Sequence, residues 1–210
     1  MPVELKFAII IVISYLLGSI NSSIIVSKLL MGKDIREYGS GNAGSTNSYR
    51  MMGGKKTLIV MAGDLLKGII AVLIAGFMFG EMGDLGGIGK MVAASSAIVG
   101  HIFPVFFGFK GGKGILTAAA VFGVFDIRVL AIILGTFIVV VLICKFVSLA
   151  SICAAAMLPV ALGILYGFSS VYFIIGLFTA ALVIFMHRSN IARLIKGTES
   201  KFSFKRKEEK

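Results

Sequence analysis

Long uncharged apolar runs limit what this chain can fold into. Seven such segments recur along the 210 residues, at about 7–31, 57–79, 91–107, 115–125, 129–143, 149–166 and 171–186. The mean hydropathy of +0.99 is too high for a soluble domain of this length. Because an unpaired backbone cannot cross the hydrocarbon, such segments must be helical. We therefore predict an all-α polytopic membrane protein with about seven transmembrane helices, in which the short segment 115–125 is either a half-span or begins within the preceding loop.

Positive charge is concentrated on one side of this predicted topology. If the N-terminus lies outside, sixteen cations fall in cytoplasmic segments and three fall outside, as the positive-inside rule requires. We therefore predict an external N-terminus, a cytoplasmic C-terminus, one membrane domain over residues 1–200 and a basic cytoplasmic tail over 201–210. The cytoplasmic cations are Lys33, Arg36, Arg50, Lys55, Lys56, Lys110, Lys113, Lys145 and the eight of residues 188–210, and the outer ones are Lys6, Lys90 and Arg128.

A polar, glycine-rich stretch over residues 39–50 follows the first apolar segment. Its glycines allow sharp turns and close approach of the backbone to a ligand. Its hydroxyl and amide side chains are short donors, and Arg50 ends it with a planar fork suited to phosphate or carboxylate. Two interpretations fit these residues: a loop that cradles an anion, and a flexible polar connector.

Four further polar groups lie in or beside the spans. Asp64 and Lys67 share a helix face, which predicts an ion pair with a supporting role. The segment 110–114 resembles a nest of backbone amides for an anion, although it is not a Walker A sequence. If the last helix continues past the membrane, His187 and Asn190 share a face. The amide of Asn21, deep in the first span, needs a partner.

In order and spacing, these segments resemble the PlsY family of bacterial membrane glycerol-3-phosphate acyltransferases. The resemblance covers almost the whole chain and rests on residues 39–50, 63–68, 100–114 and 187–199. It implies a seven-helix protein of the bacterial plasma membrane with its active site facing the cytoplasm. It also implies transfer of a fatty acyl group from acyl phosphate to the sn-1 hydroxyl of glycerol 3-phosphate, giving lysophosphatidic acid and phosphate.

The resemblance also implies which residues form the site. No metal, cofactor, nucleic acid or obligate protein partner is expected, and the partners are the two phosphorylated substrates and the bilayer. The catalytic set is Ser40, Arg50, Lys110, His187 and Asn190; the phosphate-binding set is Gly41, Asn42, Gly44, Thr46, Asn47, Gly111, Gly112, Lys113 and Gly114; the supporting set is Asp64, Lys67, His101 and Glu199.

Acyl phosphate is a reactive mixed anhydride, so the protein need only position it, stabilise charge and remove one proton. We expect Arg50 with Lys110 or Lys113 to clamp the phosphates. Two candidates for the base remain open, namely His187 oriented by Asn190 and a phosphate oxygen of the substrate. The competing class is a small transporter or anion channel for a phosphorylated solute. It is disfavoured because the polar segments are loops on one side and no internal repeat is visible.

The charge bias makes the orientation testable. A reporter fused after Lys210 is expected to be cytoplasmic, and a tag placed before Met1 is expected to be accessible from outside the cell. Reporter activity and labelling of intact cells measure the two ends independently. An external C-terminus would contradict the predicted topology.

Overall fold

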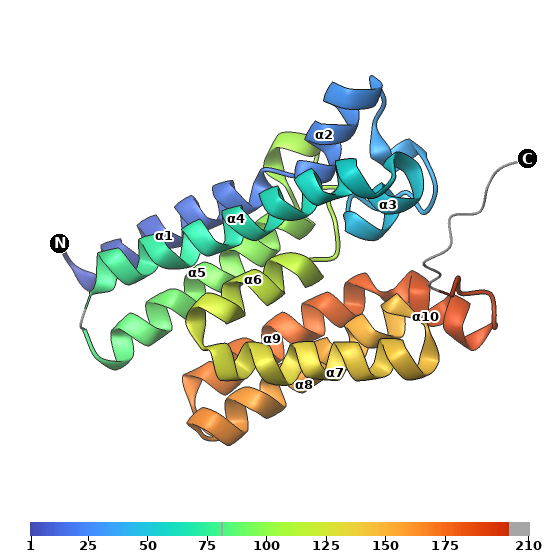
Figure 1. Cartoon of the computed structure of the whole chain (residues 1–210). Coiled ribbons are helices and arrows are strands. Elements are labelled where there is room, and N and C mark those ends of the chain that lie inside the picture. Colours follow the sequence, from blue (N-terminus) through green and yellow to red (C-terminus); the bar gives the residue numbers. More distant parts are fainter. Residues whose placement is uncertain (81, 202–210) are drawn as a thin grey trace, which may run out of the picture. The chain divides into compact units, whose positions relative to one another are not determined.

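The computed structural model describes residues 1–80 and 82–201, where all the regular secondary structure is helical. The chain divides into two compact units, one over Met1–Ile127 and one from Arg128 onward (Figure 1). The helical secondary structure confirms the predicted all-α class. The first unit holds α1 (Val3–Ser19), α2 (Ser22–Met31), η1 (Ile35–Glu37), α3 (Ser45–Met52), α4 (Gly54–Phe79), α5 (Asp84–Ile102), η2 (Val105–Phe107) and α6 (Ile115–Phe125), and the second is formed by α7 (Ile127–Cys144), α8 (Val147–Tyr166), α9 (Val171–Met186) and α10 (Arg188–Ile195).

Within the described residues, five segments are long and apolar enough to cross a membrane: α1 with α2, α4, α5 with η2, α7 and α8. The pair α9 and α10, bent by 58°, makes a sixth if it crosses as one broken span. Helix α6 has 11 residues and so spans about 16 Å, roughly half of a hydrocarbon core of about 30 Å. The count of seven spans and the orientation of the termini therefore stay predictions.

Helices α1 and α5 approach each other closely because each has a glycine, Gly18 or Gly100, packed against the backbone of the other. A Cβ added at Gly18 would overlap the carbonyl oxygen of Ala97, and one added at Gly100 would overlap that of Tyr15. Small residues allow such close packing of helices in membranes. In the first unit, α1, α4 and α5 consequently run side by side, and the chain leaves α1 and α5 at the same end (Figure 1).

The first span is broken at Ile20 and Asn21, where the backbone becomes extended between α1 and α2. The Asn21 side chain caps α2 by accepting a hydrogen bond from the Ile24 N–H at 3.1 Å. Its Nδ2 donates to the Ala43 carbonyl oxygen at 3.4 Å, in the glycine-rich loop. The amide that the sequence left in need of a partner therefore restarts the helix and holds the loop above it.

A small apolar core supports the loops at this end of the first unit. Ile24, Ile35 and Ala43 are buried together, and the partly buried Met51 and Phe107 pack against them. These residues come from α2, η1, the glycine-rich loop, α3 and η2. Both polar loops are thus anchored on the same apolar cluster.

Candidate active site

A buried ammonium lies beneath the loops. Lys67 donates to the Ile20 carbonyl oxygen at 2.8 Å, lies 2.9 Å from Asp64 Oδ1 and is 2.9 Å from His101 Nδ1. An ammonium has only donors, so His101 Nδ1 accepts and the ring proton sits on Nε2. The predicted ion pair of Asp64 and Lys67 is confirmed, and His101 from α5 joins it. The group links the break after α1 to α4 and α5.

Asn47 builds the glycine-rich loop from within. Its Nδ2 donates to the carbonyl oxygens of Ile35 at 3.2 Å and Tyr38 at 3.0 Å, and its Oδ1 accepts from the Ser40 N–H at 3.0 Å. Both amide protons are therefore committed, and the side chain is 1% exposed. The resemblance placed Asn47 among the phosphate-binding residues, but in this conformation its side chain has no N–H left to donate to a phosphate.

The loop presents other predicted site residues to solvent. Ser40, Gly41, Thr46 and Arg50 are exposed, and Asn42 is half-buried. Thr46 and Arg50 lie four residues apart on α3, so they share one face of the helix. The loop is accordingly anchored by buried groups and displays hydroxyl and guanidinium groups outward, which favours the anion-cradling interpretation over a flexible connector.

The second loop, residues 108–114 between η2 and α6, differs from its predicted form. The N–H of Gly111 donates to the Ile102 carbonyl oxygen at 3.0 Å, and that of Gly112 donates to the His101 carbonyl oxygen at 3.1 Å. The prediction that these two amides form an anion nest is therefore wrong. A Cβ at Gly112 would overlap His101 Nε2 and lie 2.7 Å from the Ala43 carbonyl oxygen. Glycine is required there for packing against α5 and the first loop, while the Lys110 side chain stays exposed.

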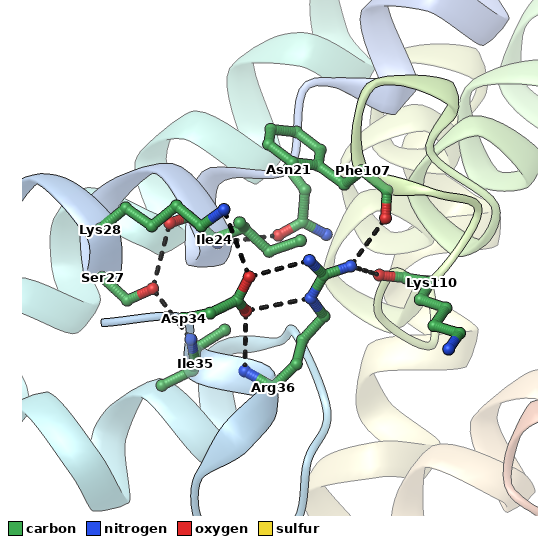
Figure 2. Close-up of polar contacts among 9 residues, drawn as sticks. All are labelled: Asn21, Ile24, Ser27, Lys28, Asp34, Ile35, Arg36, Phe107 and Lys110. Atoms are coloured by element: carbon green, nitrogen blue, oxygen red, sulfur yellow. Dashed lines mark hydrogen bonds and ion pairs between the residues drawn. The ribbon is translucent and has the colours of Figure 1, made fainter. Parts of the chain in front are cut away.

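Arg36, in η1 just before the glycine-rich loop, joins this part of the chain to the second loop. Its Nη1 donates to the carbonyl oxygens of Phe107 at 2.7 Å and Lys110 at 3.1 Å, as Figure 2 shows. Its Nη2 and Nε donate to the Asp34 carboxylate at 2.8 and 3.0 Å. The two loops, which the sequence predicts on the same side of the membrane, lie close together in the first unit. They border an open pocket of about 510 Å³ lined by Asp34, Arg36, Glu37, Gly41, Phe107, Gly108, Lys110 and Gly111.

In the second unit, Glu199 gathers the polar residues of the last motif. Its carboxylate accepts from Ser148 Oγ at 2.6 Å, Asn190 Nδ2 at 2.7 Å and Arg193 Nε at 2.6 Å. Burial of the Glu199 carboxyl would raise its pKa, but these hydrogen bonds together lower the pKa below its ordinary value. Glu199 therefore stays ionised at neutral pH and ties α8 to α10.

His187 lies where the last helix breaks. The structure bends by 58° between α9 and α10, so the last helix does not continue straight, which was the condition for His187 and Asn190 to share a face. His187 Nδ1 lies 2.8 Å from the Val183 carbonyl oxygen. A carbonyl only accepts, so Nδ1 carries a proton, and in the neutral ring Nε2 then keeps its lone pair. The ring is 3% exposed and is oriented by its own helix.

Sequence reasoning missed four residues of these networks. Arg36 and Arg193 were counted only as cytoplasmic cations, and Asp34 and Ser148 were not singled out. The available signal for Asp34 and Arg36 was an acid and a base two residues apart, just before the glycine-rich stretch. Ser148 gave no comparable signal, because a lone serine at the start of a span is typical of helix packing.

The comparisons with known proteins agree over nearly the whole chain. The family model of glycerol-3-phosphate acyltransferase matches residues 8–197. A glycerol-3-phosphate acyltransferase of Chlorobaculum tepidum is 42% identical over 97% of this chain and 99% of its own, and one from Thermoanaerobacter sp. is 43% identical over 92% and 94%. The crystal structure of PlsY, an integral membrane glycerol 3-phosphate acyltransferase in its glycerol 3-phosphate form, is similar with a TM-score of 0.84 and 36% identity over 94% of this chain and 96% of that one.

The fold and the site therefore define a multi-pass membrane enzyme with polar loops built on a helical scaffold. The chain belongs to the glycerol-3-phosphate acyltransferase family. This membership excludes the transporter or channel that the sequence left as the competing class, and it confirms the resemblance to PlsY.

The buried ion pair generates a prediction about stability. Lys67→Met leaves the Asp64 carboxylate buried without its cation and is expected to cost roughly 3–5 kcal/mol. The double variant Asp64→Leu with Lys67→Met removes both charges and should unfold at a higher temperature than Lys67→Met alone. Thermal unfolding of the detergent-purified variants measures this. A double variant at least as unstable as the single one would contradict the pairing.

Proposed function

We propose that this enzyme transfers a fatty acyl group from acyl phosphate to the sn-1 hydroxyl of glycerol 3-phosphate. The products are lysophosphatidic acid and phosphate, and the reaction is the first step of phospholipid synthesis at the cytoplasmic face of the bacterial plasma membrane. The observation that carries the proposal is the display of Ser40, Thr46, Arg50 and Lys110 on two adjacent loops above a buried scaffold. It is supported by the similar crystal structures of PlsY in a glycerol 3-phosphate form and a lysophosphatidic acid form.

The chemistry requires no covalent enzyme intermediate. The sn-1 oxygen attacks the acyl carbonyl carbon, and a tetrahedral oxyanion forms. Its collapse breaks the bond between the carbon and the phosphate oxygen, and phosphate leaves with the electron pair. The hydroxyl proton passes to a base. Positioning and charge stabilisation can therefore supply most of the rate enhancement.

The first unit is suited to hold the phosphates. Arg50 offers two parallel donors, and Lys110 and Lys113 offer point charges from the second loop. No side chain caps α3 at Gly44, so none competes with a ligand for the first amides of that helix. Ser40 and Asn42 are the proposed donors to the oxyanion. With the amides of Gly111 and Gly112 used internally, we assign the binding role of this loop to its lysines.

The second unit supplies a candidate base. His187 has its Nδ1 proton directed at the Val183 carbonyl oxygen, which leaves Nε2 unprotonated in the neutral ring, as a general base requires. The alternative base is a phosphate oxygen of the substrate. The tautomer of His187 favours the histidine, and a substitution separates the two.

The donor can be tested with purified protein in lipid vesicles. Palmitoyl phosphate and glycerol 3-phosphate together are expected to yield lysophosphatidic acid and phosphate in equal amounts, without acyl-CoA or acyl carrier protein. Mass spectrometry of the lipid, with positional analysis of the acyl chain, measures both donor and sn-1 selectivity. Turnover that requires acyl-CoA, or acylation at sn-2, would contradict the proposal.

Substitutions at Arg50 and His187 separate phosphate clamping from proton transfer. Arg50→Ala is expected to lower kcat by about 100-fold or more, because a charge at the reacting centre acts mainly in the transition state. Arg50→Lys should restore little, since one ammonium cannot replace the fork. His187→Ala should lower kcat by roughly 100- to 10,000-fold if histidine is the base. A residual rate within a few-fold of wild type would assign the proton to the substrate phosphate.

A further inference from the structure

We propose that Arg36 is a positioning residue, which holds the 107–110 segment against the glycine-rich loop and so places Lys110 for the phosphate of glycerol 3-phosphate. This inference rests on the proposed function in assigning Lys110 to that phosphate. Arg36 itself does not need to touch a substrate. Its guanidinium contacts the main chain of the second loop on one side and Asp34 on the other (Figure 2).

Asp34 fixes the direction of the Arg36 side chain. Asp34 Oδ1 accepts from the Arg36 backbone N–H and from Nε, both at 3.0 Å, and Oδ2 accepts from Nη2 at 2.8 Å. Lys28 from α2 adds a cation 3.4 Å from Oδ2. The guanidinium is therefore held in one orientation, in which Nη1 faces the second loop. Side-chain hydrogen bonding from Arg36 lowers the pKa of Asp34 to about 2, so the pair stays ionised at any pH of normal activity.

The segment that Arg36 holds contains one residue with an unfavourable backbone. Gly108 has φ 67°, which glycine adopts without strain, but Phe109 has φ 58°, and the left-handed region is uncommon for an aromatic residue. The two carbonyl oxygens that accept from Nη1, those of Phe107 and Lys110, lie on either side of this pair. One nitrogen thus closes the loop across the strained Phe109. Without it, the segment is free to relax and to carry Lys110 with it.

Lysine cannot replace this arrangement. The Arg36 contacts run in three directions from a planar group, to Asp34 through Nε and Nη2 and to the second loop through Nη1. A lysine ammonium can satisfy the carboxylate or the carbonyls, but its single nitrogen cannot span both. Arg36→Lys keeps the charge and removes the bridge, so it separates positioning from simple electrostatic attraction of the substrate.

The experiment combines amide hydrogen exchange with kinetics for Arg36→Ala, Arg36→Lys, Asp34→Asn and the control Lys33→Ala. Lys33 is exposed in the same loop and contacts the ring of Tyr38, so its removal matches the charge change without touching the bridge. The reporting amides are those of Phe109, Gly111 and Gly112, which donate to Pro104, Ile102 and His101. Kinetics with palmitoyl phosphate give kcat and the KM for glycerol 3-phosphate, for these variants, for Lys110→Ala and for the double variant Arg36→Ala with Lys110→Ala.

The Arg36 variants are expected to exchange the reporting amides at least about tenfold faster and to raise the KM by roughly tenfold or more, while Lys33→Ala changes neither. The double variant should match Lys110→Ala within about twofold, because Arg36 acts through Lys110. The proposal would be overturned if the reporting amides exchanged at the wild-type rate in the Arg36 variants. It would also be overturned if the double variant raised the KM by the product of the two single effects. Asp34→Asn carries the same test if Arg36→Ala does not fold. If the wild-type protein is inactive with palmitoyl phosphate but the Arg36 variants still exchange the reporting amides faster, the acyl phosphate reaction is refuted and the structural role of Arg36 stands.

Discussion

The Lys67 ammonium holds three parts of the first unit together. It donates to the Ile20 carbonyl oxygen at the end of α1 and to His101 Nδ1 on α5, and it forms an ion pair with Asp64 on α4. A charge buried among apolar helices is tolerated because it is paired and has acceptors nearby. The break after α1 frees the carbonyl that Lys67 needs, and the end of α5 places His101 against Gly112. The helices are thereby held in the arrangement that supports both loops.

Above this group, the loops are shaped mainly by hydrogen bonds to backbone atoms. Asn47 binds two carbonyls just before the glycine-rich loop and one N–H within it, and Asn21 binds a carbonyl of the same loop. Arg36 binds one carbonyl at the end of η2 and one in the second loop. Such contacts hold a polypeptide rich in glycine, which would otherwise have a large conformational entropy. The exposed Arg50 and Lys110 side chains are then presented from a prepared backbone, which lowers the ordering cost of binding a phosphorylated substrate.

Much of this was predictable from the sequence, and the reasons for the exceptions are local. Apolar runs identify the helices, since hydrocarbon leaves no other option for the backbone, and the spacing of Asp64 and Lys67 reveals their pairing. The internal bonds of Gly111 and Gly112 were not predictable, because a nest and a packed turn require the same glycines. The bend at His187 follows no proline or glycine signal. The role of Arg36 depends on a segment about seventy residues away, which no local pattern reports.

The acceptors of Arg36 have an evolutionary consequence. Both are main-chain carbonyl oxygens, which every amino acid at positions 107 and 110 provides. The bridge therefore constrains the path of the second loop and places no requirement of its own on the side chains at positions 107 and 110. Substitution at position 36 or 34 must be compensated within the first loop, where the carboxylate and guanidinium recognise each other. In related sequences, we expect positions 34 and 36 to covary. We expect no covariation between position 36 and positions 107 or 110, although Arg36 contacts both.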